Sequence, residues 1–216
     1  TRRSHDHAIL PEYRQRFALA VQNQIIGAAV AAVPGVTTIR LFENPTDIPD
    51  TYWGQTHWLE ILVQGGDDTA IATAIQGART YTVNLLGTTT ETIPDLYTPS
   101  LTKDISFSRP EDVDVWVELT ITKGEGYSSD TSAAAITARE DAIKAQIVNW
   151  GATRAVGLNV SVGQIAAQAM ATPTVPGIFE ISGFVGIVPA PVTTSVVAEV
   201  RQLLVFAAVR IVLVGV

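Results

Sequence analysis

The amino-acid sequence predicts an α+β protein built from two small modules, each with a mixed or antiparallel sheet. Apolar and polar residues alternate at positions 57–64 and again at 112–122, and a period of two is the pattern of a strand with a buried face. A helix, a Val-Pro-Gly turn and a strand also follow one another twice, around residues 33–36 (VPGV) and 175–178 (VPGI). This repeat indicates either two related modules or convergence on one favourable turn.

Residues 80–103 separate the two halves of the chain. The segment is rich in threonine, contains two prolines and has no helical period, so we expect it to be extended. It is either a hairpin or a docking arm, and we interpret it as the connection between the modules. The predicted modules are residues 1–104, a long N-terminal helix plus a central α+β part, and residues 105–216, a C-terminal α+β part.

The first module is expected to begin with a helix over residues 9–33. Four apolar residues recur at every fourth position and form a stripe on this helix: Tyr13, Phe17, Val21 and Ile25. In the turn that follows, proline presets φ at the second position and Gly35 supplies a positive φ at the third, which defines a type II turn. A strand over 36–43 then leads into a loop over 44–56.

The next strand, residues 57–64, leads through Gly65-Gly66 into a second helix. Asp67 or Asp68 is expected to cap that helix by accepting hydrogen bonds from its first N–H groups at the positive end of the dipole. One strand face is predicted to be buried and the other mixed, and the helix packs an apolar stripe on the sheet. The buried strand face comprises His57, Leu59, Ile61 and Val63, and the helix stripe comprises Ile71, Ala74, Ile75 and Ala78.

The second module is expected to begin with the most regular strand of the chain. Its polar face includes Trp116, and its apolar face comprises Val113, Val115, Val117, Leu119 and Ile121. Asp130 or Ser132 is predicted to cap the following helix and Gly151 to end it. Its buried stripe comprises Ile136, Ile143, Ile147 and Trp150, and Glu140 and Lys144 are spaced to pair on the outside. A helix over 162–171 and strands over 178–188 and 203–214 complete the module.

Composition argues against several classes of function. The net charge is −7 and the pI about 4.9, the wrong sign for binding nucleic acid or an anionic membrane. The chain has no cysteine, which removes thiolate chemistry and disulfides. Residues 203–216 are apolar but too few to span a bilayer and are interrupted by Arg210, so we expect a buried strand and no membrane anchor. Because only 16% of residues are charged, protein partners are expected to cover much of the surface.

No catalytic, cofactor-binding or metal site is predicted. The Gly-Gly-Asp-Asp turn at 65–68 lacks the lysine of a phosphate-binding loop and already carries two carboxylates. His5 and His7 belong to a terminal stretch without further ligands, and His57 is expected on the apolar face of its strand. Glu60 and Glu118 are carboxylates of the kind that glycosidases pair, but they belong to different modules. We therefore expect neither enzymatic activity nor a cofactor.

Four segments, taken in order, resemble the baseplate J-like family of contractile phage tails. They are EYRQR at 12–16, VPGV at 33–36 with EN at 43–44, VQGGDD at 63–68 with the helix after it, and FSRP at 107–110. None of these segments is specific by itself, and the resemblance depends on their order and spacing. In the family, the last of them opens the C-terminal domain. Members also carry a further N-terminal region that has no counterpart in this sequence.

This resemblance implies a structural baseplate wedge subunit of a contractile phage tail or a related injection particle. Such subunits form a ring around a central hub and transmit the attachment signal to sheath contraction by rearrangement at their interfaces. The implied partners are other wedge subunits, copies of itself, and hub and sheath proteins. The implied location is the tail baseplate of the virion, assembled in the host cytoplasm. Ring symmetry and the identity of the neighbours do not follow from the sequence.

Two other classes of function remain open at the level of sequence. A secreted or surface carbohydrate-binding adhesion module would bind sugar through exposed tryptophans, for which the candidates are Trp53, Trp58 and Trp116. A glycosidase would require two facing carboxylates in a deep pocket. Exposure of the tryptophans and the positions of Glu60 and Glu118 distinguish these alternatives.

Overall fold

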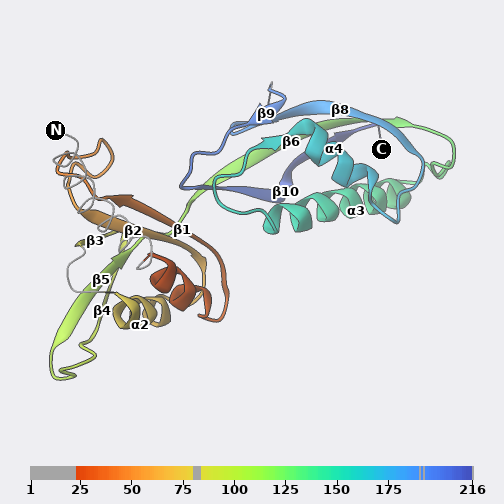
Figure 1. Cartoon of the computed structure of the whole chain (residues 1–216). Coiled ribbons are helices and arrows are strands. Elements are labelled where there is room, and N and C mark those ends of the chain that lie inside the picture. Colours follow the sequence, from red (N-terminus) through yellow and green to blue (C-terminus); the bar gives the residue numbers. More distant parts are fainter. Residues whose placement is uncertain (1–22, 80–83, 190, 192, 216) are drawn as a thin grey trace, which may run out of the picture. The chain divides into compact units, whose positions relative to one another are not determined.

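The computed structural model describes residues 23–79, 84–189, 191 and 193–215, which form an α+β protein of two compact units, Thr1–Pro110 and Glu111–Val216 (Figure 1). The predicted α+β class with mixed and antiparallel sheets is therefore confirmed. The division lies after Pro110, whereas the sequence suggested residue 104. The EYRQR segment, His5, His7 and the first part of the expected helix over 9–33 lie outside the described residues.

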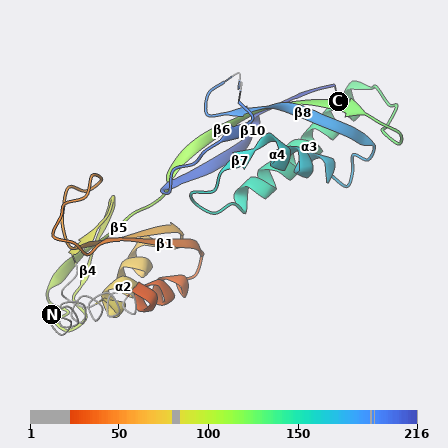
Figure 2. The same ribbon diagram turned by 45° about the horizontal axis from the view of Figure 1, so that its top comes forward.

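The first unit is a three-stranded mixed sheet with two helices on one face (Figure 2). The central strand pairs antiparallel with its neighbour on one side and parallel with a short strand on the other, across an intervening helix. The strands are β1 (Val36–Asn44), β2 (Trp58–Gly65) and β3 (Asn84–Leu86); the helices are residues 23–31 and α2 (Asp68–Ala78). Both helices share one apolar core with the sheet and with the hairpin that follows it: Ile26, Val30, Leu59, Ile61, Val63, Ile71, Ala72, Ile75, Ile93, Ile105 and Phe107.

Two details of this core differ from the sequence prediction. Ile25 is 53% exposed, whereas Ile26 and Val30 are fully buried, so the buried face of the first helix is rotated from the predicted stripe. Strand β2 is buried from Trp58 to Val63 on both faces, because the loop after β1 and the chain around Ser108 cover the face predicted to be mixed. Polar residues on that face therefore lie inside the unit.

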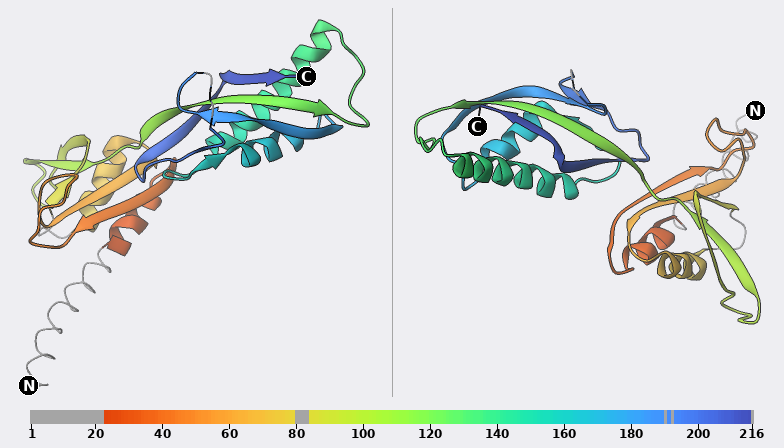
Figure 3. Two further views of the ribbon diagram at one scale, coloured as in Figure 1. Left: turned by 90° about the horizontal axis from the view of Figure 1, so that it is seen from above. Right: turned by 180° about the vertical axis from the view of Figure 1, so that it is seen from behind.

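The segment 80–103 contains β4 (Thr89–Pro94) and the start of β5 (Thr102–Phe107), and these two strands form a hairpin that belongs to the first unit (Figure 3). The prediction of a hairpin is confirmed for this part, but the segment is not a connection between modules. Ile93 and Ile105 lie in the first core, and Ser108 pairs with β2 through two backbone hydrogen bonds of 2.8 and 2.9 Å to Ile61 and Val63. This pairing explains why the first unit extends through residues 105–110.

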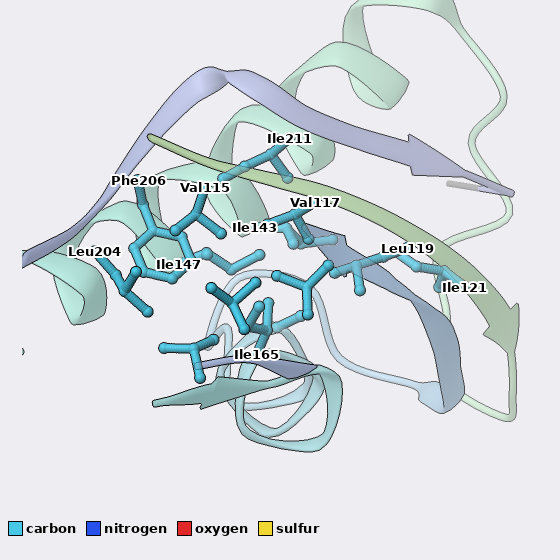
Figure 4. Close-up of a cluster of buried hydrophobic side chains, with 14 of the residues drawn as sticks. Val115, Val117, Leu119, Ile121, Ile143, Ile147, Ile165, Leu204, Phe206 and Ile211 are labelled. Atoms are coloured by element: carbon cyan, nitrogen blue, oxygen red, sulfur yellow. The ribbon is translucent and has the colours of Figure 1, made fainter. Parts of the chain in front are cut away.

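The second unit is another three-stranded mixed sheet with two helices on one face. The strands are the central β6 (Glu111–Lys123), the antiparallel β8 (Ile178–Gly186) and the parallel β10 (Gln202–Val214). The helices are α3 (Ala133–Ala152) and α4 (Val162–Met170), and β7 (Val160–Ser161) pairs with β9 (Ser195–Val196) beside them. The predicted apolar face of β6 is confirmed, because Val115, Val117, Leu119 and Ile121 point into the core with Ile143, Ile147 and Ile165 (Figure 4).

Helix α3 begins as predicted but does not end at the predicted glycine. Ser132 is the N-cap, accepting a hydrogen bond of 3.3 Å from the amide of Ala135, and Asp130 supports it by accepting the Ser132 amide. The helix continues through Gly151 to Ala152, and a Cβ at Gly151 would lie 2.4 Å from the Phe206 ring. Glycine is required there for close packing of α3 on β10 and does not terminate the helix.

The helix–turn–strand unit occurs in both halves, as predicted. Gly35 and Gly177 have φ of +85° and +79°, and the amide of Val36 closes the first turn on the carbonyl of Val33 at 3.2 Å. Each turn leads into the strand antiparallel to the central one, β1 or β8. However, this strand precedes the central strand in the first unit and follows it in the second. Simple tandem duplication does not produce that difference in order.

Candidate functional site

Arg109 binds the turn between β2 and α2 through several hydrogen bonds. Its guanidinium donates hydrogen bonds to the carbonyl oxygens of Val63 at 3.0 Å, Gly65 at 2.6 Å and Gly66 at 2.9 Å. Its Nε donates to Asp68 Oδ1 at 3.0 Å, and Nη2 also contacts that oxygen. The guanidinium also lies 5.3 Å from the centre of the Phe107 ring. The guanidinium group is planar, always charged and carries donors along two edges, so arginine is suited to bind several carbonyl oxygens and a carboxylate at once.

The turn between β2 and α2 is built to present these acceptors. Gly65 and Gly66 both have φ of +76°, which turns their carbonyl groups outward, and Asp67 caps α2 by accepting the Ala70 amide at 2.9 Å. A Cβ at Gly65 would lie 2.2 Å from the Gly35 carbonyl oxygen, so the VPGV turn packs directly on the Gly-Gly turn. We call Gly35, Gly65, Gly66, Asp68 and Arg109 the turn cluster.

The contacts around the turn cluster explain the roles of the Asp67 and Asp68 carboxylates. Asp67 occupies the helix N-terminus, and Asp68 pairs with Arg109, so the anion-binding capacity of this helix end is satisfied within the chain. The sequence indicated a structural turn here but did not bring Arg109 to it. The only signal was a compositional one, an arginine directly after a strand and before a proline, and its partner lies 41 residues away.

Glu60 is fully buried on the covered face of β2. Its Oε1 accepts a hydrogen bond from the Ser108 hydroxyl at 2.7 Å and its Oε2 accepts one from the Trp53 indole at 3.2 Å. The carboxylate thus ties the loop after β1 to the end of β5. Glu118 lies on the open face of β6 in the other unit, so the structure does not bring the two carboxylates together within either unit.

The three tryptophans proposed for sugar binding have different environments. Trp58 is only 5% exposed and offers no face to a ligand. Trp53 is half-buried, packs edge-on against Tyr52 and directs its N–H to Glu60. Trp116 is half-buried on the polar face of β6. The arrangement therefore contains no platform of two coplanar exposed tryptophans among these residues.

His57 lies outside the core, contrary to the prediction. Strand β2 begins at Trp58, and His57 adopts a φ of +51° in the preceding turn. Its Nε2 is 2.7 Å from Asp47 Oδ1, and both side chains are largely exposed. The apolar alternation of the strand therefore starts one residue later than the pattern suggested.

The tip of the β4–β5 hairpin is an ordered turn with three exposed apolar side chains. Leu96, Tyr97 and Leu101 are 55%, 76% and 61% exposed. Asp95 holds the turn by accepting the amides of Tyr97 at 2.8 Å and Thr98 at 2.9 Å, and it pairs with Lys103 at 2.8 Å. The hydrogen-bonded Lys103 and then these amides hold the pKa of Asp95 below its usual range.

The sequence contains a signal for this turn that strand and helix periodicity do not reveal. An aspartate that accepts amides two and three residues later forms an Asx turn, and Asp95 in the segment DLYT has this spacing. The threonine-rich composition of the segment indicated extended structure but not which residues project from it. We call Leu96, Tyr97 and Leu101 the hairpin tip.

Within the described ranges, no cluster of three or more His, Asp or Glu side chains is arranged to hold a metal ion. Nor does any helix in this part of the chain have both the length and the apolar character needed to cross a bilayer. No known family model matches the chain, and no curated protein matches it either.

Proposed function

We propose that the chain is a structural baseplate wedge subunit of a contractile phage tail or a related injection particle. The observation that carries this proposal is the turn cluster. VPGV, VQGGDD and FSRP are short motifs far apart in sequence, and their Gly35, Gly65, Gly66, Asp68 and Arg109 contact one another. FSRP and VQGGDD share one set of hydrogen bonds and VPGV packs against it, an arrangement that motifs resembling a family by chance have no reason to form.

The hairpin tip supports a role in assembly. Three large, largely apolar side chains are exposed within six residues, and docking against a partner would remove their apolar surface from water. The bonds of Asp95 fix the turn before binding, so less conformational entropy is lost when a partner orders it. A ring subunit binds its neighbours through such preformed surfaces, and the proposed partners are other wedge subunits, copies of itself, and hub and sheath proteins.

The buried polar groups support a structural task and not a catalytic one. Glu60, the fully buried carboxylate, is held by Ser108 and Trp53 and stabilises the covered face of β2. In this proposal the protein acts without a cofactor and binds neither nucleic acid nor membrane. Its location is the tail baseplate, with assembly in the host cytoplasm.

A complementation experiment tests the proposal. The gene is deleted in the strain that carries it, and variants are supplied in trans while particles are examined by negative-stain electron microscopy. We expect contractile tails with the wild-type chain and none without it. Replacing Leu96, Tyr97 and Leu101 together by serine is expected to abolish tails while circular dichroism stays unchanged. Ser100→Ala changes the same turn without removing an apolar side chain and serves as the control.

Two results contradict the proposal. Normal contractile tails in the deletion strain would show that the chain is not a baseplate subunit. A source strain that produces no tail-like particle under any inducing condition would have the same consequence. Normal tails with the triple-serine variant would restrict the failure to the docking role of the hairpin tip.

A further inference from the structure

One face of the second sheet carries no helix in the described part of the chain. Helices α3 and α4 lie on the opposite face, against the core side chains of β6, β8 and β10 (Figure 3). On the uncovered face, which we call the open face, three large apolar side chains are exposed. Phe184 of β8 is 44% exposed, and Val212 and Val214 of β10 are 51% and 47% exposed. Exposed apolar side chains that gather on one face indicate an interaction surface.

The register of the sheet places Glu118 of β6 between these apolar side chains. Glu118 is paired with Phe184 on one side and with Val212 on the other, and Val214 is paired with Thr120, the next residue of β6 on this face. Side chains of paired residues are neighbours on one face of a sheet. Glu118 is therefore a carboxylate with an aromatic ring on one side and a valine on the other.

Glu118 has no partner for its charge within the second unit. It is half-buried and forms no hydrogen bond or ion pair with any residue that the structure describes. A carboxylate that is partly withdrawn from water without a partner costs free energy. Asp114, on the same face of β6, is paired with Arg210 at 2.9 Å. One carboxylate of the open face thus already binds an arginine, and Glu118 is complementary to a second one.

The width of the open face fits one helix. Neighbouring strands lie about 4.8 Å apart, so the distance from β8 across β6 to β10 is about 10 Å, the diameter of an α-helix with its side chains. Pro191 closes the face at one end, because it lies 3.1 Å from the position of a Cβ on Gly186, the residue paired with Trp116. The uncovered part therefore begins beyond Trp116, at Glu118.

We infer that the open face binds an amphipathic helix of a partner protein through an arginine that reaches Glu118. The guanidinium pairs with the carboxylate, and the apolar stem of the arginine covers Phe184 and Val212. The Phe184 ring adds a cation–π contact. Apolar residues one turn away on the partner helix pack on Val214. The exposed apolar surface and the unpaired charge are then satisfied by one ligand.

The charge of the open face argues against other occupants. Three carboxylates on this face have no ion pair among the described residues: Asp112, Glu118 and Glu180. In a face-to-face pair of copies about a two-fold axis, the acidic central strands would lie opposite each other, and opposed like charges are destabilising. The same charges repel nucleic acid and anionic lipid. The partner must therefore supply positive charge together with apolar surface.

A peptide titration tests the inference, which concerns the second unit alone and does not depend on the proposed function. The probe is a synthetic, alanine-rich helical peptide of about 14 residues, ~21 Å long, with a leucine stripe and one central arginine. We expect the full chain to bind it one-to-one in isothermal titration calorimetry. Glu118→Gln is expected to weaken the affinity about tenfold or more, because it removes the charge and keeps the shape. Asp141→Asn removes an exposed carboxylate from α3 and, as the matched control, should bind like wild type.

Changes in the peptide test the arginine itself. A lysine in its place is expected to bind more weakly, because an ammonium group cannot pair in the planar, two-pronged geometry of a guanidinium or stack on a ring. A glutamate is expected to abolish binding to the wild-type chain and to restore it to Glu118→Arg. In nuclear magnetic resonance spectra, the amide signals of residues 116–120, 182–184 and 212–214 should shift on binding, and those of α3 should not.

Three results would overturn the inference. The first is no binding of the arginine peptide to the wild-type chain at a concentration of about 1 mM. The second is equal weakening by Glu118→Gln and Asp141→Asn, which would show only a non-specific attraction between opposite charges. The third is self-association of the chain that Glu118→Gln strengthens, because it would assign the open face to a second copy.

Discussion

At the scale of single residues, the turn cluster shows how much of a small fold depends on one cation. The carbonyl groups of Gly65 and Gly66 lie where β2 ends and α2 begins, and both accept hydrogen bonds from one side chain. Arg109 satisfies these groups and neutralises Asp68 at the same time. Sequence patterns predicted the turn from its glycines, but a contact over 41 residues carries no periodic signal.

We expect Arg109→Lys to destabilise the first unit by about 1.5–3 kcal/mol, the worth of a hydrogen bond to a charged group. Lysine keeps the charge beside Asp68 but cannot reach the Gly65 and Gly66 carbonyls together, because it lacks the planar fork. Chemical denaturation measures the change. Arg154→Lys, in the second unit, replaces an arginine that donates to the Asn159 carbonyl and is the control for the substitution itself. Equal stability of Arg109→Lys and wild type would contradict the assigned role.

The two Val-Pro-Gly turns are expected to differ in their tolerance of alanine. Both glycines have positive φ, which opposes any Cβ by about 1–2 kcal/mol. At Gly35 the nearest atom to a new Cβ is 3.4 Å away, whereas at Gly177 the backbone nitrogen of Tyr127 is 2.1 Å away. Gly177→Ala should therefore destabilise clearly more than Gly35→Ala in urea titrations. Equal costs at the two positions would show that backbone strain, which both share, dominates over packing on residue 127, and the reverse order would contradict the prediction.

At the scale of elements, the sequence was most informative where one face of an element meets one core. Strand β6 and helices α2 and α3 were located from their period, because each buries one stripe against one layer. The prediction of buried and exposed residues failed where other parts of the chain cover both faces of an element. The alternation along β2 predicts that Glu60 lies on the protein surface. In the structure it is buried, because Trp53 and Ser108 lie against it on that face of the sheet. Ile25 was placed one position away from the buried Ile26 because the four-residue spacing did not fix the helix phase.

The hairpin tip is expected to lose stability in acid through Asp95. The pKa of this carboxyl is lowered in the folded protein, first by Lys103 and then by the amides of Tyr97 and Thr98. The carboxylate thus stabilises the fold at pH values above its ordinary pKa of 3.8, and this contribution is lost as the pH falls through the lowered folded value. Asp95→Asn should be less stable than wild type at pH 7, and the difference should shrink below pH 3.8.

Carboxyl carbon chemical shifts provide the direct measurement for this prediction. The Asp95 titration is expected below the ordinary value in the wild type and closer to it in Lys103→Met, which removes the first cause of the shift. A titration of Asp95 that is unchanged in Lys103→Met would contradict the assigned cause.

At the scale of the whole molecule, the boundary between the units was predicted six residues too early for a physical reason. FSRP directly precedes the most regular strand of the chain, and the family resemblance implied that this motif opens the C-terminal module. The structure joins it to the first unit, because Ser108 pairs with β2 and Arg109 with the Gly-Gly turn. The second unit begins at Glu111, whose amide donates to the Arg201 carbonyl at 3.0 Å. Only the partners of residues 108–111 distinguish these assignments.

Because each unit has its own apolar core, we expect the chain to unfold in two separate steps. Ile75 lies in the first core and Ile143 in the second, both fully buried, and the two clusters share no residue. Removing either side chain to alanine costs about 2–5 kcal/mol, which lowers the melting temperature of a unit of this size by at least about 8 °C. In differential scanning calorimetry, Ile75→Ala should shift one transition and Ile143→Ala the other. A single transition that moves in both variants would mean that the units unfold cooperatively as one domain.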